Sequence, residues 1–412
     1  MRILFLSRWL PYPPDNGSKI RIHNILRQLS RRHEVALLAF RDSAERADDG
    51  VLRALRENCR SVQVLPYRSF SPSSPKALLG LLSTTPRSLV DTHSKEMAAA
   101  VSDEFGRNGS DVVVASQLAM APYALMLPEV PALLEELELS ALLDRVRQSR
   151  WPRRLRSALT WLKLSAYLRR VLPRFDACTV VSERERANLQ RVVPAYSKVH
   201  IVPNALDLTR YEGDFGPARP RTLVYPGALT YDANYDAVRY FLESIYPTVV
   251  DAVPDALFQV TGGNAGVDLS RLARQRGVLF TGHVADVRPV LAQSWATVVP
   301  LRRGGGTRLK ILESMALGTP VVSTPKGAEG LEVTDGEDIL IADGPKEFAA
   351  RVVDLLLSPD LRDRLAAGGR RLVSSAYDWN VVGQTFCALV EHVAGGADRR
   401  LCGEGRLARI CG

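Results

Sequence analysis

The chain has 412 residues, of which 46% are hydrophobic and 24% are charged. These values fit two globular domains with sizeable cores and exclude one ordinary domain. The net charge is +9, and ten basic residues lie between positions 145 and 174 with no acidic residue among them, so anionic partners are expected at one place rather than over the whole surface.

Three features of the sequence bear on where the protein works. No stretch approaches about eighteen uncharged apolar residues, so we expect no membrane-spanning helix. The apolar run at the start of the chain is too short for a signal peptide. The five cysteines are odd in number and form no metal-spaced pair, which favours a reducing, cytoplasmic compartment.

Short apolar runs alternate with amphipathic stretches along the first half of the chain. Strands are predicted at 2–7, 34–40, 61–65, 111–115, 131–135 and 176–181. Helices are predicted from Ser18 onward, over 44–58 and 91–105, and after Ser182. The Ser- and Pro-rich segment 67–86 is predicted to be a long mobile loop. This alternation predicts a mostly parallel sheet with helices on both faces.

Two groups of polar residues stand near the predicted ends of strands. The first group forms a glycine-bearing loop and the helix start after it, with Asn16, Gly17 and Ser18, the last a suitable N-cap. The second group follows the start of the strand at 131–135, with Glu135, Glu136 and Glu138. Because ligands bind at the carboxyl ends of strands in open α/β sheets, both groups are candidates for a substrate site. Solvated surface glutamates are the alternative.

The basic stretch 145–172 combines arginines with Trp151, Trp161 and several leucines. This composition is typical of an amphipathic segment at a membrane surface, and several cations near an anionic leaflet suffice for reversible docking. An ordinary helix that packs against its own domain explains the pattern equally well. No nucleic-acid-binding module accompanies the patch, so we expect no nucleic acid partner.

The second half of the chain repeats the alternation of strands and helices. Strands are predicted at 222–225, 257–260, 278–281 and 338–341, and helices at 345–358 and 359–373 and from Trp379 to His392. The boundary between the domains is expected between Asp207 and Pro220, in a stretch rich in Gly, Pro and charge. Residues from Gly395 onward are expected to form a poorly ordered basic tail.

One stretch of this half, PLRRGGGTRLKILESMALGTPVV at 300–322, predicts a glycine turn, a helix and a short strand after an apolar run. Glycines at such a turn let the backbone approach a ligand, and the helix start offers an anion site. Four cations surround the turn, Arg302, Arg303, Arg308 and Lys310. The pattern therefore predicts a bound phosphate.

Lys310 and Glu313 share one face of the predicted helix. The cation can hold a diphosphate while the carboxylate accepts hydrogen bonds from the hydroxyls of a sugar, so the pair predicts a nucleotide site. A solvated helix face behind a glycine linker is the alternative.

The string GGGTRLKILESMALGTPVVS, followed by Gly327 and Glu329-Gly330-Leu331, resembles the donor-site signature of retaining glycosyltransferases of the GT-B fold, in the large family numbered four (glycosyl transferases group 1). The resemblance implies two doubly wound, Rossmann-like α/β domains that face each other across a cleft. Their expected bounds are 1–207 for the acceptor domain, 208–380 for the donor domain, 381–394 for a helix that crosses back and 395–412 for the tail.

The resemblance also implies a reaction and its residues. A sugar passes from a nucleotide-sugar donor, such as a UDP- or GDP-sugar, to a glycan or a lipid-linked acceptor, with retention and without a cofactor. Arg308 and Lys310 stabilise the diphosphate and Glu313 binds the ribose. The expected donor contacts are Gly227, Gly262, Gly263, His283, Val284, Arg302, Gly304, Gly305, Gly306 and Thr307. The expected acceptor-side residues are Asn16, Gly17, Ser18, Glu136 and Glu138.

The sequence departs from the pattern of the family at two places. Gly305 stands where the family usually has a glutamate, eight positions before Glu313. The arginine and lysine that usually follow Gly227 are absent, so phosphate binding is expected to shift to Arg302, Arg308 and Lys310. This variant pattern is similar to a subgroup associated with bacterial exopolysaccharide biosynthesis.

Two other functions remain open from the sequence. A nucleotide-sugar epimerase on the same fold needs acid and base groups on the donor domain, and none is well placed. His283 is expected to make a packing or edge contact. A non-catalytic nucleotide-sugar-binding protein or membrane scaffold is motivated by Gly305 and the missing cation pair. No Asp-x-Asp pair stands at a strand end, so we expect no required metal.

Overall fold

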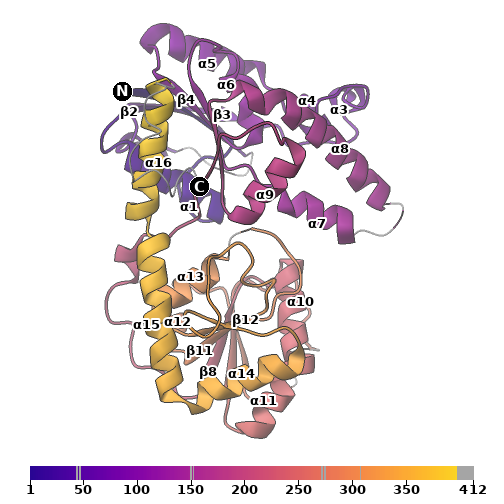
Figure 1. Cartoon of the computed structure of the whole chain (residues 1–412), viewed down its shortest axis with the longest axis vertical. Helices are drawn as coiled ribbons and strands as arrows, with labels where there is room; N and C mark the ends of the chain where they lie inside the picture. Colours follow the sequence, from indigo (N-terminus) through magenta and orange to yellow (C-terminus); the bar gives the residue numbers. More distant parts are fainter. Residues whose placement is uncertain are drawn as a thin grey trace. The chain divides into compact units, whose positions relative to one another are not determined.

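The computed structural model describes residues 1–42, 45, 48–148, 151, 153–270, 272, 275–306 and 308–396. These residues form two compact units (Figure 1). Unit 1 contains Met1–Pro203 together with the C-terminal segment from Val382, and unit 2 contains Asn204–Val381. Most of the predicted tail, 397–412, lies outside the described residues.

The units divide between Pro203 and Asn204, whereas the sequence placed the boundary after Asp207. Backbone pairing explains the difference, because the Leu206 N–H donates to the Tyr377 carbonyl at 2.8 Å and the Trp379 N–H donates to the Leu206 carbonyl at 2.9 Å. Leu206 is therefore fastened to the C-terminal part of unit 2.

Unit 1 is built on a seven-stranded parallel sheet with the strand order β3-β2-β1-β4-β5-β6-β7. Its strands are β1 (Arg2–Ser7), β2 (Glu34–Arg41), β3 (Ser61–Pro66), β4 (Val112–Ser116), β5 (Ala132–Glu135), β6 (Ala177–Val180) and β7 (Val199–Ile201). Apolar side chains on both faces of the central strands are buried, as is typical of a parallel sheet covered by helices. The predicted strands are confirmed to within a residue or two at their ends.

The helices of unit 1 are α1 (Gly17–Leu29), α2 (Asp49–Arg56), α3 (Pro75–Leu79), α4 (Arg87–Asp91), α5 (Lys95–Asn108), α6 (Ala121–Ala124), α7 (Ser140–Gln148), α8 (Arg153–Val171) and α9 (Glu183–Val192). The last helix, α16 (Trp379–Ala394), belongs to this unit from Val382 onward. The helix predicted at 44–58 is shorter than expected, because Asp48 caps α2; residues 43, 44, 46 and 47 lie outside the described part.

Segment 67–86 was predicted to be loop throughout, and this prediction is wrong. It contains α3, whose N-cap Ser74 accepts a hydrogen bond from the Ala77 N–H at 3.0 Å. The buried carboxylate of Asp91 accepts hydrogen bonds from the Ser71 N–H, at 2.8 Å, and from the Ser74 hydroxyl. These bonds tie the segment to the rest of unit 1.

Unit 2 has a six-stranded parallel sheet with the order β10-β9-β8-β11-β12-β13. The strands are β8 (Thr222–Pro226), β9 (Leu257–Thr261), β10 (Val278–Gly282), β11 (Ala296–Val299), β12 (Val321–Ser323) and β13 (Leu340–Ile341). The helices are α10 (Asp232–Tyr240), α11 (Tyr246–Ala252), α12 (Arg288–Ala292), α13 (Leu309–Ala316), α14 (Pro345–Leu357) and α15 (Pro359–Ala376).

Sequence analysis did not predict α10 and α11, which a π-helical turn at Phe241–Ile245 joins. In the described part of the chain, no helix combines the length and the hydropathy needed to cross a bilayer.

Candidate functional site

The donor-side residues predicted in unit 2 lie near the carboxyl ends of β8 and β11. These neighbouring strands mark the point where the order of the sheet changes direction: β8 continues to β9 and β10 on one side, and β11 continues to β12 and β13 on the other. Ligands of open α/β sheets bind at such a switch point. Gly227 follows β8, and the glycine turn, residues 304–306, leads from β11 toward α13.

Arg308 holds the glycine turn in a defined shape. Gly304 and Gly306 have φ values of +103° and +82°, which residues with a side chain rarely adopt. The Arg308 guanidinium donates from Nη1 to the Gly305 carbonyl and from Nη2 to the Gly304 carbonyl, both at 2.8 Å. Arg308 therefore shapes the turn and also supplies positive charge beside it. Thr307, another predicted donor contact, lies outside the described residues.

Lys310 lies in a cradle of neutral polar groups, formed by Tyr225 and Asn234. Its ammonium donates to the Tyr225 hydroxyl at 3.0 Å and to Asn234 Oδ1 at 3.2 Å. The Tyr225 hydroxyl donates to Asn234 Oδ1 at 2.7 Å, and Asn234 Nδ2 donates to the Ala228 carbonyl at 2.9 Å. Burial, together with the charge of Arg308, lowers the pKa of Lys310 to about 7. Because the groups of the cradle are neutral, they orient Lys310 without neutralising it.

Glu313 lies one turn further along α13 and contacts Tyr211. The Tyr211 hydroxyl donates to Glu313 Oε1 at 3.0 Å. Tyr211 ends the short 3-10 helix Leu208–Tyr211, which precedes β8. Burial raises the pKa of Glu313, against the opposing effects of this hydrogen bond and of Lys310. The tyrosine orients one carboxylate oxygen, and a pair of neighbouring sugar hydroxyls is a suitable ligand for the carboxylate.

The arginines before the glycine turn are bound to α10. Arg302 donates from Nη2 to Asp236 Oδ1 at 2.7 Å and from Nε to Asp236 Oδ2 at 3.2 Å, and its guanidinium lies 4.4 Å from the centroid of the Tyr240 ring. Arg303 forms an ion pair with Asp232 at 3.0 Å. Arg302 was assigned to the donor phosphates, but here it fastens the loop after β11 to α10. Our candidates for the phosphate contacts are therefore Arg308 and Lys310.

Two glycines allow the loops after β8 and β9 to approach each other closely. A Cβ on Gly262, whose φ is +134°, would lie 2.5 Å from the carbonyl carbon of Gly227. A Cβ on Gly227 would lie 2.8 Å from Lys310 Nζ. The absence of side chains at these positions thus makes room for the lysine cradle.

Replacing Gly262 with alanine is expected to lower the free energy of unfolding by about 1–3 kcal/mol, because the methyl group overlaps backbone and the φ is unfavourable. Gly263→Ala is the matched control, since a Cβ there meets no atom within 4 Å, and a change within about 0.5 kcal/mol is expected. Urea unfolding measures both. Equal stability of the two variants would show that the close approach is not required.

His283 and Val284 follow β10 at the same edge of this sheet. His283 is exposed and Val284 is half-buried. Gly282 ends β10 with a φ of +68°, and its carbonyl accepts a hydrogen bond from the Gly262 N–H at 2.9 Å. Both residues therefore belong to the group of strand-end loops, and the donor contact expected of them stays a prediction.

Unit 1 carries a pocket of about 300 Å³ beside the carboxyl ends of β4 and β5, lined by Ser18, Gln117, Leu118, Ala119, Glu136, Leu137, Glu138, Leu139 and Leu164. Gln117 and Glu136 have φ values of +71° and +57°, and such strained residues cluster at functional sites. Gln117 Nε2 donates to Glu136 Oε2 at 3.2 Å and to the Ser18 hydroxyl at 3.5 Å. The pocket offers amide, carboxyl and hydroxyl groups to a ligand.

An ion pair beside this pocket fixes the end of β5. Arg21 and Glu135 are fully buried, with 2.5 Å between Nε and Oε1, and the Ser116 hydroxyl donates to Glu135 Oε2 at 2.7 Å. Burial raises the pKa of Glu136 to about 7, and the charge of Glu135 adds to the increase. Glu135 is thus structural, whereas Glu136 is available to a ligand.

The other predicted acceptor-side residues take different places. Asn16 caps α1, because its side chain accepts a hydrogen bond from the Lys19 N–H at 3.1 Å, so the expectation that Ser18 is the N-cap is wrong. The Ser18 hydroxyl contacts Gln117 instead. Gly17 is exposed in the first turn of α1, and Glu138 is exposed at the pocket.

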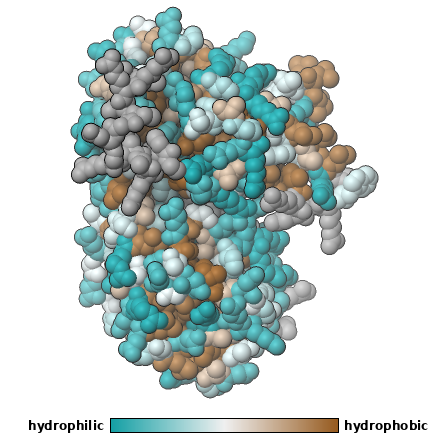
Figure 2. Space-filling view, in the orientation of Figure 1, coloured by the Kyte–Doolittle hydropathy of each residue, from teal (hydrophilic) through white to brown (hydrophobic). Residues whose placement is uncertain are grey.

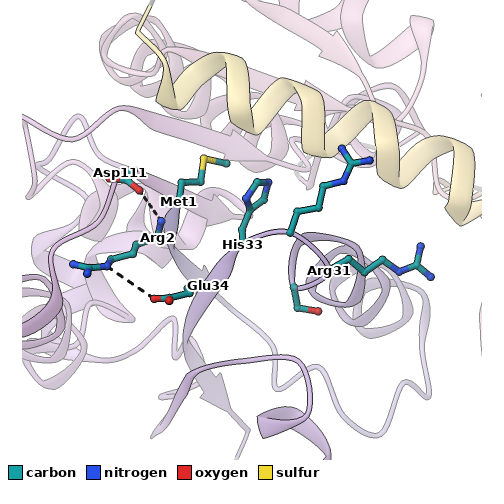
Figure 3. A pocket seen from close by; sticks show the side chains of 8 residues that line it. Met1, Arg2, Arg31, His33, Glu34 and Asp111 are labelled. Carbon is teal, nitrogen blue, oxygen red and sulfur yellow. Dashed lines mark hydrogen bonds and ion pairs between the residues drawn. The ribbon is translucent and has the colours of Figure 1, made fainter.

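A more open pocket of about 480 Å³ lies at the opposite edge of this sheet, where β1 and β2 begin (Figure 3). The Arg2 N–H donates to Asp111 Oδ2 at 2.6 Å, and the Arg2 side chain faces Glu34 at 3.9 Å. His33 Nε2 lies 2.9 Å from Glu391 Oε1 of α16. These contacts fasten the start of the chain and α16 to unit 1, away from the strand ends that bind ligands.

Sequence analysis missed four residues that organise these sites: Tyr211, Tyr225, Asn234 and Gln117. Gln117 had a usable signal, since it lies two positions after the end of the strand predicted at 111–115. Asn234 was passed over because α10 was not predicted, and Tyr225 was counted only as the last residue of the strand predicted at 222–225. The long separation of Tyr211 from Glu313 left no signal in the sequence.

The comparisons with known proteins agree with this architecture. The protein resembles the solved structure of Anabaena Alr3699/HepE in complex with UDP and glucose, with a TM-score of 0.63, 15% identity and coverage of 95% of this chain and 99% of that one. It also resembles sucrose-phosphate synthase from Thermosynechococcus elongatus, with a TM-score of 0.68, 15% identity and coverage of 96% and 100%. The two parallel-sheet domains thus form a GT-B fold.

Residues 220–358 match the family described as glycosyl transferases group 1, and residues 16–205 match the glycosyl transferase 4-like domain. The chain therefore consists of two glycosyltransferase domains, a 4-like domain in its first half and a group 1 domain in its second half. A phosphatidyl-myo-inositol mannosyltransferase of Mycobacterium leprae is 30% identical over 187 residues, which cover 43% of this chain. The match spans about half of that relative, 48% of its length.

Proposed function

We propose that this protein is a glycosyltransferase that moves a sugar, with retention, from a nucleoside diphosphate to an acceptor hydroxyl. The observation that carries the proposal is the arrangement on α13: Lys310 held by Tyr225 and Asn234, and Glu313 held by Tyr211 one turn later. This arrangement offers a cation to a diphosphate and a carboxylate to a ribose. The UDP in the structure of Alr3699/HepE supports a nucleotide-sugar donor.

In the proposed reaction the acceptor oxygen forms a bond to the anomeric carbon, and the bond from that carbon to the diphosphate breaks. The acceptor oxygen approaches the anomeric carbon on the same face of the sugar that the diphosphate leaves, and the leaving diphosphate oxygen takes the acceptor proton. Arg308 and Lys310 stabilise the negative charge that develops on the diphosphate, which is the largest contribution that a preorganised site makes. Glu313 anchors the nucleotide and takes no part in bond breaking.

For the acceptor we propose the pocket at Ser18, Gln117 and Glu136, whose groups suit a hydroxyl-bearing ligand. A lipid-linked acceptor is supported by the name of the Mycobacterium leprae relative, which acts on phosphatidyl-myo-inositol. We further propose a role in bacterial exopolysaccharide or cell-surface glycan assembly at the cytoplasmic face of the membrane. The free, buried thiols of Cys59, Cys178 and Cys387 suit that compartment.

A panel of UDP-, GDP- and ADP-sugars tests the proposal through thermal stabilisation and release of nucleoside diphosphate. We expect one donor to stabilise the protein, by about 2.7 kcal/mol at a hundredfold excess over its Kd, and to release its diphosphate when a lipid-linked acceptor is present. A donor that binds but is never consumed, with any acceptor, would instead identify a nucleotide-sugar-binding protein that has lost activity with the glutamate replaced by Gly305.

A further inference from the structure

Two neighbouring segments of unit 1 expose an unusual share of large apolar side chains. Fifteen such side chains are exposed in the described part of the protein, and eight of them come from these segments. The first segment, the end of α3 and the turn after it, contributes Leu78, Leu79, Leu81 and Leu82; the second, the start of α8 and the residue two positions before it, contributes Trp151, Leu155, Leu159 and Leu162. Exposed apolar area of this kind marks an interaction surface.

The spacing along α8 shows that its apolar residues form one stripe. Leu155, Leu159 and Leu162 follow one another at intervals of four and three residues, which places them on one side of α8. Trp151 precedes the helix by two positions. Another side of α8 packs on its own domain, where Tyr167 and Leu168 are buried. The exposed stripe is therefore additional to the face that holds α8 in the fold.

Hydrogen bonds join the two segments into a single surface. Lys163 Nζ donates to the carbonyls of Gly80 and Leu81, at 3.0 and 2.7 Å. The Arg170 guanidinium donates to the hydroxyls of Thr84 and Thr85, at 2.9 and 3.0 Å. The turn that carries the leucines is thus held against α8. We call the eight exposed side chains and the cations between them the leucine face. Figure 2 shows the brown, apolar surface over the α3 and α8 region.

Charge identifies the partner. Residues 67–90 and 145–174 contain no Asp or Glu, while the described, exposed Arg154 and Arg156 stand beside the stripe. A second copy of the protein, docked face to face, would bring these like charges together. A surface built from apolar and basic side chains, on segments without acidic residues, is complementary to an anionic lipid bilayer.

We propose that the leucine face seats the protein on anionic membranes, with Leu79 and Leu82 entering the acyl boundary and the arginines binding headgroups. This extends the membrane contact predicted for 145–172 to a second segment that the sequence assigned to a loop. The proposal stands apart from sugar transfer, because neither the donor site nor the acceptor pocket supplies any of the eight side chains.

Sedimentation with vesicles tests it, using phosphatidylcholine alone or mixed with phosphatidylglycerol, at low salt and without donor or acceptor. The protein should pellet with the mixed vesicles. L79S/L82S should reduce the partition coefficient at least about tenfold, and R154A/R156A should reduce it about fivefold for each cation removed. Leu357→Ser is the control, because Leu357 on α14 is also an exposed leucine, at 59% against 68% for Leu79 and 91% for Leu82, and this variant should pellet like the wild type.

Failure to pellet with the mixed vesicles, or pelleting unchanged in L79S/L82S, would overturn the proposal. So would a wild-type dimer in sedimentation equilibrium that L79S/L82S converts to monomer. Thermal unfolding checks that the substitutions leave the fold intact, which is expected because the side chains are exposed. Since the vesicles carry no sugar acceptor, a negative result here leaves the donor-panel test of the transferase proposal untouched.

Discussion

Replacing Glu313 with glutamine is expected to lower kcat/KM for the nucleotide-sugar donor by about 10- to 100-fold. A hydrogen bond to a charged group contributes about 1.5–3 kcal/mol, and the variant keeps the shape of the side chain but loses the charge. The loss should appear in donor affinity, with kcat at saturating donor little changed, because the proposed partner of Glu313 is the ribose, which does not change during the reaction. Isothermal titration with the donor and initial rates measure the two quantities.

Tyr211→Phe is the matched comparison for this prediction. It removes the hydroxyl that donates to Glu313 Oε1 at 3.0 Å but keeps the carboxyl group itself, so a loss of only a fewfold is expected. Glu313→Gln with unchanged donor affinity would contradict the assignment of Glu313 to the ribose. A lower melting temperature would point to misfolding instead, so both variants need thermal unfolding as a control.

The organisation of the donor domain could be predicted because its signals are local. A strand, three glycines, a cation and a carboxylate follow one another between positions 296 and 313, and residues three or four apart on a helix share a face without any knowledge of the fold. The parallel sheets were predictable for the same reason, since each strand is a short apolar run.

The partners of these residues were not predictable, because they come from distant parts of the chain. Asn234 lies 76 positions from Lys310 and Tyr211 lies 102 positions from Glu313. Arg302 shows the limit of local signals: its charge predicts a phosphate contact, which stays a prediction, and the fold adds that the carboxylate of Asp236 lies 2.7 Å away. The cations near a turn can be identified from the sequence. Which of them form ion pairs with carboxylates of the protein can be seen only in the folded structure.

The affinity for the donor is expected to depend on pH through the protonation of Lys310. Its pKa in the free protein is about 7 because it is buried among neutral groups, near Arg308. A bound diphosphate favours the charged form and raises that pKa in the complex. Above pH 7 the neutral lysine must therefore take up a proton as the donor binds, and Kd should increase about tenfold for each pH unit. Below pH 7 the lysine is already charged, so Kd should level off.

Titration calorimetry with an intact nucleotide sugar between pH 6 and 9 measures this slope, and buffers with different ionisation enthalpies measure the proton uptake directly. Lys310→Met should bind more weakly at neutral pH and lose the slope. Asn234→Asp places a carboxylate about where Asn234 Oδ1 now lies, 3.2 Å from Lys310 Nζ. An adjacent anion raises the pKa of the lysine, so in this variant Kd should begin to increase at a higher pH than in the wild type.

An affinity that stays constant from pH 6 to 9 in the wild type would show that the lysine keeps its proton in the free protein. In that case the Tyr225–Asn234 cradle would serve only to position the charge of Lys310, and donor binding would not be linked to proton uptake.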